Sequence, residues 1–180
     1  MRKYLLSGVA AVLLSGCGSQ PDTAVGKQLL VSSSFENLDG WLADSPAATS
    51  LTRERAHTGE YSTMIGPRHE FSLGYSNLLS RLAPDRPAKL AIGAWVWLPS
   101  DQAAAKLVTE IKGLEGGPNL LWEGLDVAQA AKVHNKWQYV TQTITLPPAA
   151  GPNNRLLVYL WRANSPQPVY LDDVSISLAQ

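Results

Sequence analysis

Turn-forming residues recur along the chain every ten to fifteen residues, and this spacing constrains the fold more than any other feature. The turn segments are NLDG, AHTGE, IGPR, APDRP, LPSD, LEGGPN, LPPAAGPNN and NSPQP. The runs between them read as short strands, near residues 27–35, 49–55, 60–65, 70–82, 88–98, 105–112, 119–125, 137–146, 154–162 and 168–178. Short strands joined by Gly- and Pro-rich turns predict an all-β domain, a two-sheet β-sandwich of the jelly-roll type. The best helix candidate, DQAAAKLVTEIKG, overlaps one of these runs.

The N-terminal segment has the pattern of an export signal. A basic start, MRKY, is followed by the apolar run LLSGVAAVLL, which is too short to span a membrane. The sequence LSGC, which ends at Cys17, resembles the bacterial lipobox, in which the cysteine is lipidated and becomes the new N-terminus. We therefore expect a lipoprotein signal peptide at residues 1–16, a lipidated cysteine and polar tether at 17–26, and one domain at 27–180.

Cys17 is the only cysteine of the chain, so no disulfide can form within the exported domain. The alternative interpretation is a secreted protein with one free thiol, which is a liability outside the cell. Lipidation predicts a protein anchored by its acyl chains to a membrane of the cell envelope. Gly18 stands where enterobacterial lipoproteins retained at the inner membrane carry Asp, and this resemblance favours the outer membrane.

The charge balance argues against nucleic acid as a partner. Removing Arg2 and Lys3 with the signal peptide leaves 13 of the 15 basic residues, against 15 acidic ones. The expected domain therefore has a slight negative charge, and its basic residues form no cluster along the sequence.

Two of the predicted strands combine an aliphatic face with an aromatic one. In KLAIGAWVWLP, every second residue from Leu90 to Leu98 is aliphatic, and the other face carries Trp95 and Trp97. In RLLVYLWRA, the face opposite the aliphatic one carries Arg155, Tyr159 and Trp161, together with Leu157. If both aliphatic faces pack into the core, the aromatic faces are expected to lie together on the outer side of one sheet.

An outward group of Trp and Tyr side chains has the properties of a sugar-binding surface. Their flat apolar rings can stack on pyranose faces while polar neighbours donate and accept hydrogen bonds. Arg81, Glu110 and Arg155 are the candidates for these polar neighbours. Trp122, which follows the EGGPN loop, is a further candidate for the ligand-binding group.

A structural role is the alternative for each of these aromatic residues, because Trp side chains are usually buried. Trp95 and Trp161 could pack under loops or under the tether, and Trp122 fits either class. Trp41 and Trp137 are interpreted as structural, since the first follows a turn and the second begins the strand-like run WQYVTQTITL.

The last predicted strand, VYLDDVSISL, contains two adjacent carboxylates. Strict alternation places Asp172 on the apolar face with Tyr170 and Val174, and Asp173 on the face that looks outward with Ser175. A carboxylate on an apolar face needs a charge, a set of hydrogen-bond donors or a metal ion. The sequence leaves these three partners open.

Catalytic motifs do not stand out in the sequence. It contains no Gly-x-Ser-x-Gly elbow, no His-Glu-x-x-His pair and no phosphate-binding loop. His57, His69 and His134 are far apart along the chain. A pair of facing carboxylates of the glycosidase type is not excluded by composition, so a small glycoside hydrolase is the least favoured interpretation.

Four segments carry a family resemblance: SSSFENLDGW, RAHTGEYSTMIG, WQYVTQTITLP and VYLDDVSISL, in this order. Together they resemble the jelly-roll carbohydrate-binding modules of the cellulose- and xylan-binding type (the 4/9/22 group), which have a galactose-binding-domain-like fold. The resemblance covers about residues 27 to 178. It implies a non-catalytic domain that binds a polysaccharide or another cell-envelope glycan.

The same resemblance implies a structural calcium ion. Such modules commonly hold the ion near their first and last strands, with the Glu of the FE pair and the first Asp of DDV as ligands. In this chain these residues are Glu36 and Asp172. The alternatives for Asp172 are backbone amides, or the guanidinium group of Arg53 or Arg55.

These observations predict a non-catalytic, membrane-anchored lipoprotein whose jelly roll binds glycan or another ligand of the cell envelope. The alternative is a structural or assembly lipoprotein that binds a protein partner through the same sheet.

Overall fold

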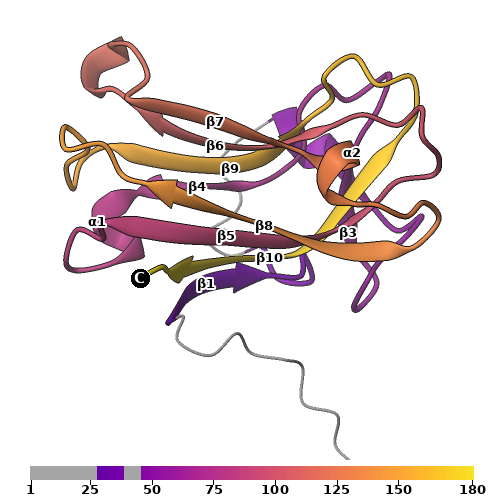
Figure 1. The fold of residues 1–180 in the computed structure, drawn as a ribbon, viewed down its shortest axis with the longest axis horizontal. Helices are drawn as coiled ribbons and strands as arrows, with labels where there is room; N and C mark the ends of the chain where they lie inside the picture. Colours follow the sequence, from indigo (N-terminus) through magenta and orange to yellow (C-terminus); the bar gives the residue numbers. More distant parts are fainter. Residues whose placement is uncertain (1–27, 39–45) are drawn as a thin grey trace, which may run out of the picture.

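The structure, a computed structural model, describes residues 28–38 and 46–180, and the described residues form a sandwich of two antiparallel sheets (Figure 1). The larger sheet contains β1 (Leu29–Ser33), β2 (Leu51–Thr52), β3 (Ser62–Ile65), β5 (Lys89–Trp97), β8 (Trp137–Thr145) and β10 (Val169–Leu178). The four-stranded sheet contains β4 (Tyr75–Leu78), β6 (Lys106–Lys112), β7 (Leu121–Asp126) and β9 (Arg155–Trp161). The helical segments are single turns, namely η1 (Pro46–Ser50), α1 (Leu79–Leu82), η2 (Leu114–Gly116) and α2 (Val127–Ala130).

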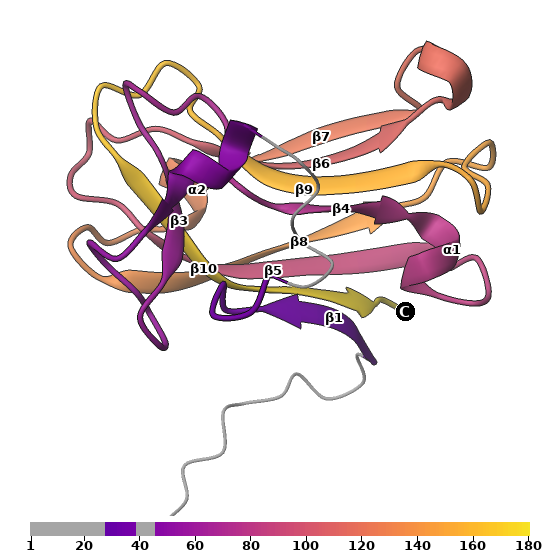
Figure 2. The ribbon, with the colours of Figure 1, turned by 180° about the vertical axis from the view of Figure 1, so that it is seen from behind.

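The strand orders are β2-β3-β10-β5-β8, with β1 also paired to β10, and β4-β9-β6-β7. One edge of β10 is shared, because its N-terminal residues pair with β3 and its C-terminal residues pair with β1, while β5 runs along the other edge. The view from behind shows the two layers stacked face to face, with α1 at one end of the sandwich (Figure 2). The predicted two-sheet β-sandwich is confirmed. Within residues 28–38 and 46–180, no helix has the length and apolar character of a transmembrane span.

Alternating aliphatic residues of both sheets meet in the core between the layers. The face of β5 from Leu90 to Val96 and the face of β9 from Leu156 to Leu160 are buried there, as their periodicity predicts. The helix candidate DQAAAKLVTEIKG instead contains β6, whose Leu107 and Ile111 are fully buried. Its Val, Thr and Ile residues pack well on a pleated surface, which favours the strand over the helix.

The expectation that the aromatic faces of β5 and β9 lie together is wrong. Each strand buries its aliphatic face in the same core, but β5 belongs to the larger sheet and β9 to the four-stranded sheet. Trp95 and Trp97 therefore point away from the core on one side of the sandwich, and Tyr159 and Trp161 on the opposite side. Periodicity along one strand defines its faces, but it does not tell which sheet the strand joins.

Candidate functional site

The outer surface of the four-stranded sheet gathers most of the aromatic and polar residues that the sequence singles out. Cross-strand register aligns Trp122 of β7 with Glu110 of β6, and Glu110 with Leu157 of β9. Val108 of β6 is in turn paired with Tyr159 of β9. Paired residues project to the same side of a sheet, so these side chains share the surface that faces away from the core.

An open cavity of about 300 Å³ lies on this surface, and we call it the aromatic cavity. Its walls are Glu70, Phe71, Trp122, Tyr159 and Trp161. The indole rings of Trp122 and Trp161 have centroids 6.1 Å apart at an interplanar angle of 78°. Phe71 and Tyr159 form a second pair, with centroids 5.8 Å apart at 75°. The cavity thus combines four aromatic rings with one carboxylate.

Glu110 lies beside the aromatic cavity as a buried carboxylate with three side-chain donors. Its Oε2 accepts a hydrogen bond from the Tyr159 hydroxyl at 3.1 Å, and its Oε1 accepts one from Lys112 Nζ at 2.6 Å. The side-chain amide of Asn119 also donates to Oε1. A buried carboxylate is costly unless it is paired and hydrogen-bonded, and this network meets both conditions. The network fixes the position of the Tyr159 ring.

Gly74 allows the close approach of chain segments that places Tyr159. A Cβ atom at Gly74 would lie 2.0 Å from the carbonyl oxygen of Val158 and 2.9 Å from Cβ of Tyr159. The first of these contacts is with backbone, which cannot move aside without shifting β9. Gly74 is therefore required by the packing of the segment before β4 against β9.

Two of the predicted polar neighbours lie away from the aromatic cavity. Arg81 is exposed in α1, at the end of the sandwich. Arg155 begins β9, at the opposite end of that strand from Trp161, and donates to the carbonyl oxygen of Ser76 at 3.1 Å. The structure therefore groups Glu110, Trp122, Tyr159 and Trp161 of the predicted residues, and leaves both arginines outside the group.

Trp95 and Trp97, on the opposite side of the sandwich, are covered by the segment between β2 and β3. The Arg55 guanidinium lies 3.7 Å from the ring centroid of Trp97, which is buried. The His57 imidazole stacks on Trp95, with centroids 3.9 Å apart at an interplanar angle of 14°. These contacts favour the structural alternative for Trp97, and for Trp95 they leave only part of the ring accessible.

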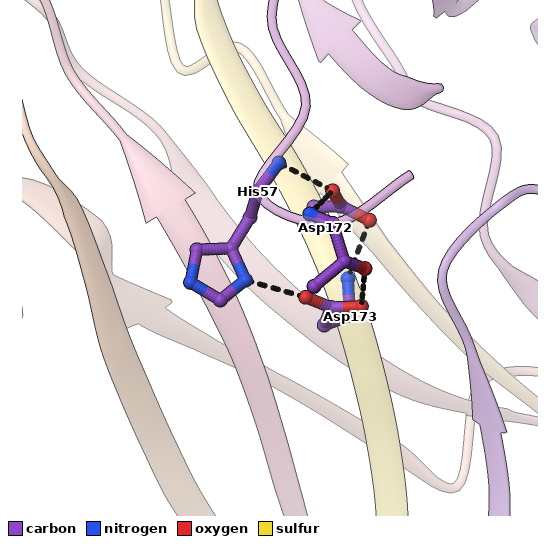
Figure 3. A network of polar contacts seen from close by, with 4 residues as sticks. His57, Asp172 and Asp173 are labelled. Carbon is purple, nitrogen blue, oxygen red and sulfur yellow. Dashed lines mark hydrogen bonds and ion pairs between the residues drawn. The ribbon is translucent and has the colours of Figure 1, made fainter. Parts of the chain in front are cut away.

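Asp172 and Asp173 hold this covering segment in place (Figure 3). Asp172 Oδ2 accepts hydrogen bonds from the amides of His57 at 2.7 Å and Thr58 at 3.2 Å. Asp173 contacts the side chains of the same two residues, His57 Nδ1 at 2.5 Å and Thr58 Oγ1 at 2.7 Å. The fully buried Asp172 also accepts a hydrogen bond from the amide of Asp173. Backbone amides, which the sequence left open, are thus the partners in the structure.

The predicted face of Asp172 is wrong, because β10 contains a β-bulge. Asp172 pairs with Trp95, and the next pair in this register joins Ser175 to Gly93, so the strand has an extra residue between them. Asp173 has a positive φ of 45°. The bulge resets the alternation: Asp172 lies with Trp95 on the outer face, and Val174 returns to the core. Asp172 is buried by the covering segment rather than by the sandwich core.

The surroundings of Asp172 disfavour its charge. Burial raises the pKa of Asp172 to about 6, and the nearby charge of Asp173 acts in the same direction. The backbone hydrogen bonds from His57, Asp173 and Thr58 oppose this rise. Near neutral pH, Asp172 is therefore ionised but less favourably than an exposed aspartate.

Glu36 lies in a region that suits a hard cation, whereas Asp172 is already supplied with donors. Glu36 lines a cavity of about 410 Å³ together with Ser32, Ser33, Ser34, Asn37, Thr58 and Asp173. Its Oε1 accepts hydrogen bonds from the amides of Glu60 at 2.9 Å and Tyr61 at 2.7 Å. Hydroxyl, amide and carboxylate oxygens are suitable calcium ligands. However, no three His, Cys, Asp or Glu side chains gather as a metal cluster within residues 28–38 and 46–180. Calcium binding by Glu36 and Asp172 stays a prediction.

Several residues of these two surfaces are not predicted from the sequence. Glu70 and Phe71 lie before β4 and reach the aromatic cavity through an isolated bridge between Phe71 and Trp161. Asn119 belongs to the EGGPN turn, and Lys112 stands two residues after Glu110. These positions in the sequence are the features from which their contacts with Glu110 could be predicted. His57 is 116 residues from Asp173, and nothing local indicates their contact. Cys17 and Trp41 lie outside the described residues.

The comparison with solved structures supports this architecture. No family profile and no curated protein sequence matches the chain. Among solved structures, the xylan-binding domain CBM22-1 of Paenibacillus barcinonensis Xyn10C matches with a TM-score of 0.55 and 22% identity, over 86% of this chain and 96% of that one. A second match, described as a family 16 carbohydrate-binding module, has a TM-score of 0.55 and 20% identity, over 83% and 99%.

A third match is the C-terminal family 22 module of Clostridium thermocellum Xyn10B, with a TM-score of 0.55 and 13% identity, over 84% of this chain and 94% of that one. Identities this low establish the fold alone. The predicted resemblance in fold is thereby confirmed, and the described domain has the β-sandwich fold of carbohydrate-binding modules of families 22 and 16.

Proposed function

We propose that the outer surface of the four-stranded sheet binds a glycan, and that the domain acts by binding rather than by catalysis. The observation that carries the proposal is the aromatic cavity, in which Trp122 and Trp161 lie beside the fixed hydroxyl of Tyr159. Aromatic rings offer apolar surface to the C–H faces of a sugar, while nearby polar groups bind its hydroxyls. The fold shared with carbohydrate-binding modules supports the proposal.

The protein would act from a membrane. The lipobox-like LSGC sequence supports lipid attachment at Cys17, which would hold the domain at the cell envelope, with the outer membrane favoured. Replacement of Cys17 by Ser tests this part of the proposal separately. The variant should leave the membrane fraction or remain unprocessed, whereas unchanged membrane attachment of a correctly cleaved variant contradicts lipidation.

Affinity electrophoresis through gels that contain soluble polysaccharides, followed by a glycan array, tests glycan binding directly. Retardation by at least one glycan, competed by its oligosaccharides, is the expected result. Release of reducing ends from the bound glycan would instead indicate hydrolysis. If no glycan is retained and one protein is recovered in stoichiometric amount from the cell envelope, the protein-partner alternative takes the place of this proposal.

A further inference from the structure

The rings of the aromatic cavity meet at near right angles rather than forming a flat platform. The indoles of Trp122 and Trp161 are inclined by 78°, and the rings of Phe71 and Tyr159 by 75°. A pyranose face stacks on one flat ring at a time, whereas rings at right angles wall a concave space on more than one side. Because the face of each ring carries partial negative charge, such a space attracts a positively charged group.

Glu70 adds a full negative charge to the same wall. Its Oε1 accepts a hydrogen bond from the indole N–H of Trp161 at 3.3 Å, so the carboxylate lies beside the Trp161 ring in the wall of the cavity. Among the described residues, no Lys, Arg or His lies within ion-pair distance of Glu70, in contrast to Glu110, which is paired with Lys112. The charge of Glu70 is therefore available to a ligand.

The basic residue nearest to this wall is Lys106, whose Cδ lies close to Gly124, as does the Trp122 ring, and which forms no ion pair among the described residues. Lys106 of β6 pairs with Trp161 on one side and with Asp126 of β7 on the other. Lys106 is not among the residues that line the aromatic cavity. The residues that line the cavity thus include one carboxylate and four aromatic rings, and no basic side chain.

We propose that the aromatic cavity selects glycans that carry a positively charged amino group, such as polymers of glucosamine without acetyl groups; this inference rests on the proposed glycan-binding function. The ammonium group lies against the rings of Trp122 and Trp161 and within reach of the Glu70 carboxylate. The sugar backbone extends along the sheet surface towards Glu110. A hydroxyl or an acetylated nitrogen at the same position gains neither the cation–π contact nor the ion pair.

Three matched oligosaccharides with the same linkage and length test the proposal: one of glucose, one of N-acetylglucosamine and one of glucosamine. Their affinities for the purified protein are measured by titration calorimetry in mildly acidic buffer, where the glucosamine nitrogens are protonated. The glucosamine oligomer should bind more than about fivefold more tightly than the glucose oligomer, because one cation–π contact at an exposed site supports a ratio of about two to five and the ion pair with Glu70 adds to it. Glu70→Gln keeps an acceptor for Trp161 but removes the ion pair, so it should lower the preference to the ratio of about two- to fivefold that the cation–π contact alone supports.

Glu123→Gln is the matched control, because Glu123 is an exposed carboxylate of β7 outside the aromatic cavity. It should leave the preference unchanged. Equal affinity for the charged and neutral oligomers overturns the inference and leaves the proposed function intact. A preference that is unchanged in Glu70→Gln, or that falls equally in Glu123→Gln, overturns it too, since the carboxylate of the cavity then has no specific part in selecting the charged sugar. If no glycan of any kind binds, the proposed function fails and the inference fails with it.

Discussion

The hydroxyl of Tyr159 donates a hydrogen bond to the carboxylate of Glu110, with 3.1 Å between the two oxygens. This contact joins the aromatic cavity to the buried polar network beside it. Burial, followed by the charge of Glu110, raises the pKa of Tyr159 to about 12, so the phenol keeps its proton and its role as a donor throughout the physiological range. The Tyr159 ring is therefore held in one orientation by the buried carboxylate of Glu110.

Tyr159→Phe should lower the free energy of unfolding by about 1–2 kcal/mol, because the buried Glu110 loses one of its donors while the ring remains. Urea denaturation measures the difference. Tyr139→Phe is the control: its hydroxyl is exposed and lies 3.5 Å from Ser175 Oγ, so its removal should have little effect. Equal losses of stability in the two variants would show that the Tyr159 hydroxyl has no special role.

Trp97→Ala should destabilise the domain by about 3–5 kcal/mol, because Trp97 is buried under Arg55. The variant should bind glycan with unchanged affinity wherever it remains folded, since Trp97 lies on the opposite side of the sandwich from the aromatic cavity. Thermal melting and calorimetric titration measure the two effects. Weaker glycan binding with an unchanged melting temperature would place the ligand on the larger sheet instead of the four-stranded sheet.

Asp172 should make stability depend on pH. Its pKa is raised in the folded state from 3.8 to about 6, so the folded protein binds the proton more tightly than the unfolded chain. The stabilisation of the folded state by this bound proton is fully present below pH 3.8 and is lost as the pH rises through about 6. The difference between the two pKa values corresponds to roughly 3 kcal/mol in the free energy of unfolding. Asp172→Asn should remove this part of the pH dependence in denaturation experiments with chelator present. An unchanged pH profile in the variant would assign the effect to other groups.

Calcium, if it binds beside Glu36, should stabilise the folded state by mass action. Chelator should then lower the melting temperature, and added calcium should restore it. Glu36→Gln should abolish this response, whereas Glu123→Gln, far along the chain on β7, should retain it. A melting temperature that changes neither with chelator nor with calcium would show that the amides of Glu60 and Tyr61 suffice as partners for Glu36.

The sequence predicts the strands better than it predicts how they are arranged. All ten predicted runs overlap the ten described strands, because turn spacing and alternation are local properties. The sheet that each strand joins is decided by contacts between distant residues. For this reason the faces of β5 and β9 are predicted correctly, while their common surface is not.

The outer surfaces of the two sheets are also predicted only in part from the sequence. Glu110, Trp122, Tyr159 and Trp161 are recognisable as candidates from residue type and alternation alone. Glu70 and Phe71 are not, because they belong to an irregular segment before β4 whose approach to Trp161 depends on tertiary packing. The bulge at Asp173 is likewise invisible to strict alternation, which assigns Asp172 to the wrong face.

The comparison of Trp122→Ala with Tyr139→Ala shows which outer surface of the sandwich binds the glycan. The two side chains are similarly exposed, 46% and 52%, and they lie on opposite sheets, so each variant should fold normally. With a glycan found by affinity electrophoresis, Trp122→Ala should weaken binding by about fivefold or more, as expected for a lost ring contact of about 1 kcal/mol, and Tyr139→Ala should bind as the unaltered protein does. Weaker binding in Tyr139→Ala together with normal binding in Trp122→Ala would show that the glycan lies on the larger sheet and not in the aromatic cavity.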